Sequence, residues 1–208
     1  MHYTSDIAFT ESVKKIQSRK GSRDIYARLE KNGSWPTEIT HDLADFVATQ
    51  KSFFLATAND KGQPYIQHRG GPPGFLKVID SKTMAFADYK GNRQFISQGN
   101  LSENPQAFIF LIDFTNRIRV KIWGKAKVLE GKPEILSKLM PNKNKYNAKI
   151  EQVIVFSVEA WDRNCPQHIP QRIDIEDLQK VLSERDRKIE VLEKQIHQLK
   201  TNQNRMPD

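Results

Sequence analysis

The chain has 208 residues, which is enough for one well-filled core with an appendage or for two small domains and excludes a large multidomain enzyme. Its 38% hydrophobic and 28% charged residues are typical of a soluble globular protein. Lysine and arginine number 33 against 25 aspartate and glutamate, and the net charge of +8 favours anionic partners: nucleic acid, a phosphorylated metabolite or a phosphate-bearing cofactor.

Signals for export, membrane insertion and metal binding are weak. No run approaches the roughly 20 apolar residues of a membrane span, and the N-terminus lacks the order of a signal peptide, so we expect a cytoplasmic protein. The single cysteine, Cys165, cannot form an intramolecular disulfide, which agrees with a reducing compartment. Cys165 and His168 have the spacing of two metal ligands, but the chain offers no second pair, so we expect no metal site.

The N-terminal segment 1–41 predicts short helices. Thr10 and Ser22 are typical N-caps of two apolar-periodic stretches, and Asn32-Gly33 ends the second stretch. Thr40 is a typical N-cap of a third helix. The apolar face of that helix consists of Leu43, Phe46 and Val47.

After Gln50 the pattern changes to short apolar runs separated by turn residues. The runs between 52 and 89 predict an antiparallel meander. Few helices interrupt the strands, and closing a sheet removes its edges, so we expect a mainly β fold with flanking helices, built on a six-stranded antiparallel barrel. Residues 132–141 predict a helix and 142–149 a basic loop. The later strands are expected at 107–114, 117–129 and 153–161.

The stretch 66–78 (IQHRGGPPGFLKV) concentrates polar side chains at the end of one strand and on the next. Alternate residues of a strand face opposite sides, so Gln67 and Arg69 share a face while His68 points the other way. Lys77 follows on the next strand. The alternative is that this stretch binds no ligand and is an edge turn whose charges face solvent.

The stretch 87–101 (ADYKGNRQFISQGNL) predicts an anion site. Gly91 and Asn92 form a turn after a strand, and Arg93 opens a helix, so free backbone N–H groups and a cation converge where a phosphate would sit. Arginine is suited to this role because its planar fork holds two phosphate oxygens at once. We expect the meander to bring Arg69 and Lys77 close to this turn.

The stretch 160–172 (AWDRNCPQHIPQR) follows the last strand and is too rich in functional side chains for a linker. Its two prolines force an extended path. A nucleophilic role for Cys165 would need a base and a thiolate-favouring environment, and the sequence shows neither. We expect an ordered segment that lays polar side chains over a ligand, in this subunit or in a partner.

The C-terminal segment 174–208 predicts a coiled coil. Ile or Leu occupies the first core position and mostly Leu the second, which favours two parallel strands, and Lys188 would face Glu193 of the partner subunit. The alternative is a helix packed on its own barrel, but the narrow apolar stripe favours pairing of two chains. The stripe is interrupted at Arg185. It consists of Ile175, Leu178, Leu182, Ile189, Leu192, Ile196 and Leu199.

These segments, in this order, resemble the pyridoxamine 5'-phosphate oxidase-like, FMN-binding split-barrel family, in the branch with a terminal motif like NCPQHI. The matching stretches are FFLATANDKGQPYIQHRGG, FLKV, FADYKGNR, NLSENPQAFIFLIDF, RIRVKIWGKA and AWDRNCPQHIPQR. The resemblance spans about 42–172. It implies a split barrel over 42–173, a homodimer with two FMN molecules at the subunit interface, and redox chemistry at the isoalloxazine ring.

Carried over by position, the resemblance also implies a set of cofactor contacts. Arg69, Lys77 and Arg93 would supply the cations around the phosphate. No catalytic residue is assigned, and the oxidase's own C-terminal signature is absent, which argues against oxidation of pyridoxamine phosphate. The implied contacts are Gln67, His68, Arg69, Lys77, Gly91, Asn92, Arg93, Arg119, Trp161, Gln167, His168 and Arg172.

We therefore expect an FMN-dependent oxidoreductase that acts on an unidentified small molecule and forms a homodimer through the barrel and the coiled coil. One alternative is a protein that binds or senses flavin, haem or deazaflavin without turnover. Another is a nucleic-acid-binding module, prompted by the net charge and the basic loop, but no helix-turn-helix, finger or RNA-recognition signature is visible.

Overall fold

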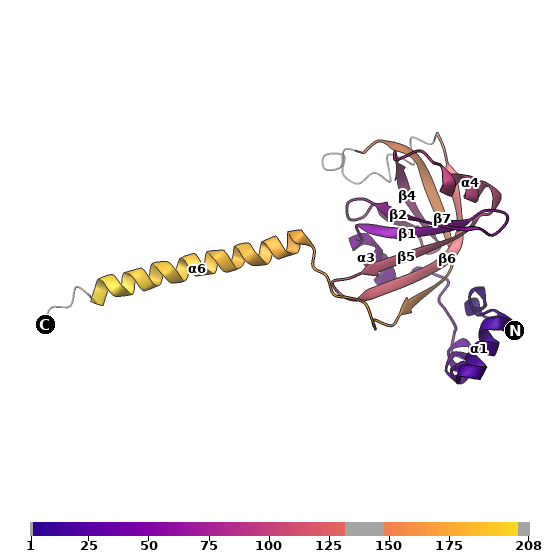
Figure 1. The fold of residues 1–208 in the computed structure, drawn as a ribbon, viewed down its shortest axis with the longest axis horizontal. Coiled ribbons are helices and arrows are strands. Elements are labelled where there is room, and N and C mark those ends of the chain that lie inside the picture. Colours follow the sequence, from indigo (N-terminus) through magenta and orange to yellow (C-terminus); the bar gives the residue numbers. More distant parts are fainter. Residues whose placement is uncertain (1, 132–147, 204–208) are drawn as a thin grey trace. The chain divides into compact units, whose positions relative to one another are not determined.

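The computed structural model describes residues 2–131 and 148–203, which divide into two compact units (Figure 1). The first unit extends to Asp113 and resumes from Ile118 to Gln167; the second joins Phe114–Arg117 to the chain from His168 onward. The helix expected at 132–141 and most of the basic loop at 142–149 lie outside the described residues. The expected division into segments 1–41, 42–173 and 174–208 stays a prediction.

The helices that precede the sheet begin where the sequence predicts caps. The side chain of Thr10 accepts a hydrogen bond from the Val13 amide, and that of Thr40 from the Leu43 amide, each at 3.3 Å. Ser22 precedes its helix but makes no side-chain cap bond. These elements are η1 (Thr4–Ile7), α1 (Glu11–Lys20), α2 (Arg23–Lys31) and α3 (His41–Thr49).

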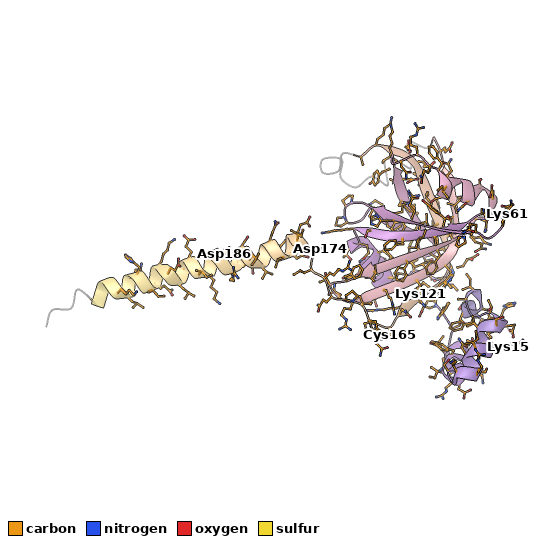
Figure 2. All side chains as sticks on the ribbon, in the orientation of Figure 1. Lys15, Lys61, Lys121, Cys165, Asp174 and Asp186 are labelled. Atoms are coloured by element: carbon orange, nitrogen blue, oxygen red, sulfur yellow. The ribbon has the colours of Figure 1, made fainter. Side chains whose placement is uncertain are left out.

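Aromatic side chains fasten this helical segment to the sheet. Trp35 is buried and stacks on Trp123 of β6 (Ile118–Leu129), with ring centroids 4.7 Å apart. The Thr4 hydroxyl donates to the Trp35 carbonyl at 2.6 Å. Lys121, labelled in Figure 2, lies over both tryptophan rings and pairs with Asp162 at 2.7 Å. The N-terminal helices are therefore part of the first unit.

The sheet has seven antiparallel strands in the order β2-β1-β5-β6-β7-β4-β3. The expected count of six was wrong, because residues 52–89 form four strands and the later stretches form three. The expected meander was also wrong: β1 pairs with β2 and β3 with β4, but β2 does not pair with β3. The further strands and the helix between β4 and β5 are β1 (Ser52–Ala58), β2 (Pro64–Gly70), β3 (Leu76–Asp80), β4 (Thr83–Tyr89), α4 (Ile96–Glu103), β5 (Gln106–Asp113) and β7 (Ile150–Asn164).

The sheet is open, since β2 and β3 lie at its two ends and do not pair. The connection between them contains Pro72 and Pro73, which have no amide hydrogen to donate, so a tight hairpin is disfavoured there. The sheet nevertheless curls: Phe53 of β1 meets Phe86 of β4 with ring centroids 5.0 Å apart, although β1 and β4 are not neighbours in the sheet.

The inner face of the curled sheet forms the hydrophobic core. Each fully buried side chain of this size contributes roughly 1.5–3 kcal/mol of transfer free energy. Strand alternation places these side chains inside and their sequence neighbours outside. The largest buried residues are Phe53, Phe75, Phe86, Phe156, Leu55, Leu76, Met84, Ile109, Leu111, Ile122 and Ile154.

The second unit contains the 29-residue helix α6 (Ile175–Gln203), about 44 Å long at 1.5 Å per residue. Its apolar stripe is exposed to solvent. The pairing of this helix in a coiled coil stays a prediction. Within the described residues, no helix combines the length and the apolar character that crossing a membrane requires.

Candidate cofactor site

A small cavity of ≈ 50 Å³ lies where the end strand β2 of the curled sheet approaches β4, the strand next to the other end. Strands β2, β4 and β7 and the segment that leads into α4 contribute its walls. The lining residues are Tyr65, Gln67, Arg69, Asp88, Tyr89, Gly91, Asn92, Arg93, Gln94, Phe95, Ile96, Ser97, Gln98, Glu151 and Gln152.

Strand register places Gln67 and Arg69 on the inner face of β2. Gln67 lies opposite Leu55 and Arg69 opposite Phe53, and both of these partners are buried in the core. His68 points outward, where its ring meets that of Phe54 with centroids 5.7 Å apart. The face assignment expected from strand alternation is therefore what the structure has.

Arg69 reaches from the end strand β2 to β4. Its Nη1 pairs with Oδ1 of Asp88 on β4, and the other oxygen of Asp88 accepts from Nε2 of Gln152 at 2.9 Å. Both members of the ion pair are only 13% exposed. Within the described residues, the buried Nε of Arg69 has no hydrogen-bond partner. Arg69 thus has one unpaired donor, which is buried beside the cavity.

The N-terminus of α4 opens onto the same cavity. Its N-cap, Phe95, adopts the left-handed conformation (φ 54°), and no side chain in the described part of the protein caps the first turn. Arg93 is also left-handed (φ 60°), and the helix begins at Ile96 and not at Arg93 as the sequence predicts. The hydroxyl of Ser97 donates to Oε1 of Gln67 at 3.0 Å, which fixes the first turn against β2. Uncapped N–H groups at a helix N-terminus bind anions.

Arg93 stands at the mouth of the cavity. Its side chain is 60% exposed, and its Nε lies 3.7 Å from Oε1 of Glu151, a long and solvent-screened ion pair. Its guanidinium lies 5.6 Å from the centre of the Phe95 ring, which holds the side chain beside the helix N-terminus. The side-chain oxygen of Asn92 accepts a hydrogen bond from the Gln94 amide at 3.2 Å and stabilises the turn. Arg93 can therefore turn toward an anion at small cost.

Several residues implied by the resemblance do not line this cavity. Leu76 faces the core, so Lys77 lies on the other face of β3. Arg119 lies opposite Asn164, whose amide oxygen, oriented to satisfy both groups, accepts from Arg119 Nε and Nη2 at 2.9 Å each. Trp161 donates from its ring to the Glu38 carbonyl at 2.8 Å.

The remaining implied residues follow β7. Gln167 is exposed at the end of the first unit. His168 and Arg172 belong to the second unit, where His168 is left-handed (φ 61°) and the Arg172 guanidinium lies 4.4 Å from the centre of the Phe114 ring. Their role toward a cofactor stays a prediction.

Sequence reasoning missed Asp88, Ser97 and the Glu151–Gln152 pair. A signal existed for Asp88, a lone acid in the otherwise apolar strand TMAFADY. Ser97 and the two β7 residues carried no signal, because their place in the cavity depends on how the sheet curls.

The family model described as pyridoxamine 5'-phosphate oxidase matches residues 39–166, which include all seven strands of the sheet and every lining residue of the cavity. The chain belongs to the pyridoxamine 5'-phosphate oxidase family. No curated protein matches the chain by sequence.

Solved structures similar to this family member include HupZ from Group A Streptococcus, with 20% identity and a TM-score of 0.48 over 65% of this chain and 99% of that one. An FMN-binding protein from Syntrophomonas wolfei is 15% identical, with a TM-score of 0.47 over 76% of this chain and 98% of that one. A protein related to general stress protein 26 from Clostridium acetobutylicum is 14% identical, with a TM-score of 0.43 over 64% and 92% of the two chains.

Proposed function

We propose that this family member is an FMN-dependent oxidoreductase that holds the phosphate of FMN in the cavity between β2 and α4. The observation that carries the proposal is the convergence of the uncapped α4 N-terminus, Arg93 and Arg69 on one cavity, where the buried Nε of Arg69 has no hydrogen-bond partner among the described residues. A phosphate monoester matches this donor set, because backbone N–H groups and arginine forks are its preferred partners in proteins. The residues present therefore fit the group.

Each of these residues has a definite task. The Arg93 guanidinium binds phosphate oxygens from the solvent side, and Arg69 donates from the inner side while Asp88 and Gln152 hold its orientation. Ser97 and Gln67 keep the helix N-terminus in place. When bound, FMN supplies hydride or electron transfer at its ring.

The phosphate contact is tested by comparing FMN with riboflavin, which has the same ring and no phosphate. We expect FMN to bind at least about 100-fold more tightly, since two charge-assisted contacts contribute roughly 1.5–3 kcal/mol each. Titration monitored by flavin fluorescence gives both dissociation constants. A protein that binds neither flavin, or both equally, contradicts the proposal.

Addition of NADH or NADPH to the FMN-loaded protein under anaerobic conditions then separates turnover from storage. Bleaching of the visible flavin absorbance, on the order of seconds to minutes, is expected of an oxidoreductase. Binding without reduction by either donor would favour the alternative of a flavin carrier or sensor. Haem and deazaflavin added to the same protein give distinct spectra.

We further propose that the flavin ring lies between two copies of the chain. A cavity of ≈ 50 Å³ holds a few water molecules and is too small to enclose an isoalloxazine ring. The outer face of β2, β1 and β5 offers a surface to a second copy: Ile66 is 62% exposed, and half-buried Phe54, Phe108 and Phe110 continue the apolar row. The edge strand β2 carries both this face and the cavity.

The proposed interface on the outer face of β2, β1 and β5 is tested with Ile66→Asp, a substitution on this face and outside the cavity. We expect a charge in the contact to weaken FMN binding at least about tenfold. The matched control is Ile79→Asp on β3, where a 55% exposed isoleucine lies away from this face, and FMN binding should be unchanged. Wild-type affinity in Ile66→Asp would reject this interface and leave the phosphate site standing.

A further inference from the structure

We infer that α6 pairs with α6 of a second copy of this chain as a parallel, in-register, two-stranded coiled coil, and that Arg185 sets the register. The stripe on α6 is exposed along its length in the described part of the chain. The inference does not depend on FMN binding, because it concerns this helix alone.

The spacing of the apolar residues in the stripe indicates that its partner is a second copy of α6. Apolar residues alternate at intervals of three and four, a repeat of 3.5 residues, which keeps a narrow seam facing a partner helix. A helix that packs on a globular surface carries a broader apolar face. The first core position holds Ile175, Leu182, Ile189 and Ile196, and the second holds Leu178, Arg185, Leu192 and Leu199.

Intrahelical ion pairs reveal which charges remain for a partner. Lys180 pairs with Asp177 at 3.1 Å and Lys194 with Glu190 at 2.8 Å, all on the side away from the seam. Among the described residues, neither Lys188 nor Glu193 forms an ion pair, and both flank the seam. These two charges are therefore available to a second helix.

Their positions decide the orientation. In a parallel dimer Lys188 lies beside Glu193 of the partner subunit, and symmetry repeats the contact, which gives two attractive pairs. An antiparallel dimer that matches all core layers would bring Lys188 near the partner's Lys188 and Asp186 near the partner's Asp186. Both antiparallel contacts are repulsive. Charge complementarity thus favours the parallel pair.

Arg185 explains why only one register is suitable. In register, it faces Arg185 of the partner subunit, and each guanidinium can leave the seam toward Asp186, from which it already lies 3.3 Å. A shift by one heptad would place Arg185 against a leucine layer and leave a charge next to apolar side chains without a matching layer. Polar residues at single core positions specify register in this way, at a cost in stability.

Disulfide formation in the full-length chain tests the pairing and its direction. In a Cys165→Ser background, Leu192→Cys places identical thiols opposite each other in a parallel, in-register dimer, within the distance that a disulfide spans. We expect a covalent dimer to form under mild oxidation at least about tenfold faster than with Lys194→Cys, which faces away from the seam. A non-reducing gel gives both rates.

Two outcomes would overturn the inference. Equal rates for Leu192→Cys and Lys194→Cys would mean that α6 does not pair along this seam. Mixed disulfides between a Leu182→Cys chain and a size-tagged Leu192→Cys chain, exceeding those between identical positions, would mean an antiparallel pair. Failure of FMN binding would change neither result.

The role of Arg185 has its own test. A Leu192→Cys chain mixed with a size-tagged Leu199→Cys chain should give almost no mixed disulfide, because these positions are one heptad apart. With Arg185→Leu in both chains, we expect mixed disulfides to rise at least about fivefold, as shifted registers become acceptable. An unchanged yield would show that Arg185 does not set the register.

Discussion

Arg93→Ala is expected to weaken FMN binding by about 10- to 100-fold, measured as the dissociation constant in a fluorescence titration. A charge-assisted hydrogen bond between guanidinium and phosphate contributes roughly 1.5–3 kcal/mol, and each 1.4 kcal/mol is tenfold in affinity. The existing pair of Arg93 with Glu151 is long, so little is lost from the free protein when the side chain is removed.

Three comparisons isolate the phosphate contact from a general structural effect. Riboflavin affinity should change less than about threefold in Arg93→Ala, because riboflavin has no phosphate to lose. Arg93→Lys should recover part of the FMN affinity, since the charge returns without the planar fork. The control Arg187→Ala removes an equal charge from the outer side of the exposed helix α6 and should leave FMN binding unchanged. If Arg93→Ala and Arg187→Ala bind FMN equally, the phosphate lies elsewhere.

Local patterns in the sequence predicted the parts of the site that depend on a single strand or turn. Gln67 and Arg69 share a face because strand alternation is a local property, and the turn that Asn92 stabilises follows from its residue type. Thr10 and Thr40 cap helices for the same reason. The family resemblance, drawn from the order of the motifs, agrees with the family model that matches 39–166.

Features of the site that depend on tertiary geometry could not be predicted from local sequence patterns. Lys77 was expected near Arg69. Leu76 is buried in the core, however, and because successive residues of a strand face opposite sides, Lys77 lies on the other face of β3. Asp88 neutralises part of the charge of Arg69 only because the sheet curls until β2 meets β4. The closure of six strands was expected from the general cost of sheet edges, whereas the structure leaves seven strands open between β2 and β3.

The fold that holds the site depends strongly on one glycine. Gly124 lies on β6, where the pairing with β7 shifts register, and a Cβ added there would lie 2.0 Å from the Ser157 carbonyl oxygen and 2.7 Å from Cε1 of Phe156. Phe156 is fully buried, and Ser157 also pairs with Thr83 of β4, so neither neighbour can move without disturbing two strand pairs.

Gly124→Ala is therefore expected to destabilise the protein by about 3 kcal/mol or more, which corresponds to a fall in melting temperature of roughly 6–12 °C for a chain of this size. Thermal and urea unfolding of the purified variant measure the effect. The matched control is Gly99→Ala in the middle of α4, where an added Cβ meets nothing within 4 Å. That substitution should stabilise the helix by about 0.5–1 kcal/mol, since alanine loses less backbone entropy than glycine. Equal stability of the two variants would mean that β6 and β7 can separate at the register shift without a loss of stability. The pairing of β6 with β7 would then not hold the cavity wall formed by Glu151 and Gln152.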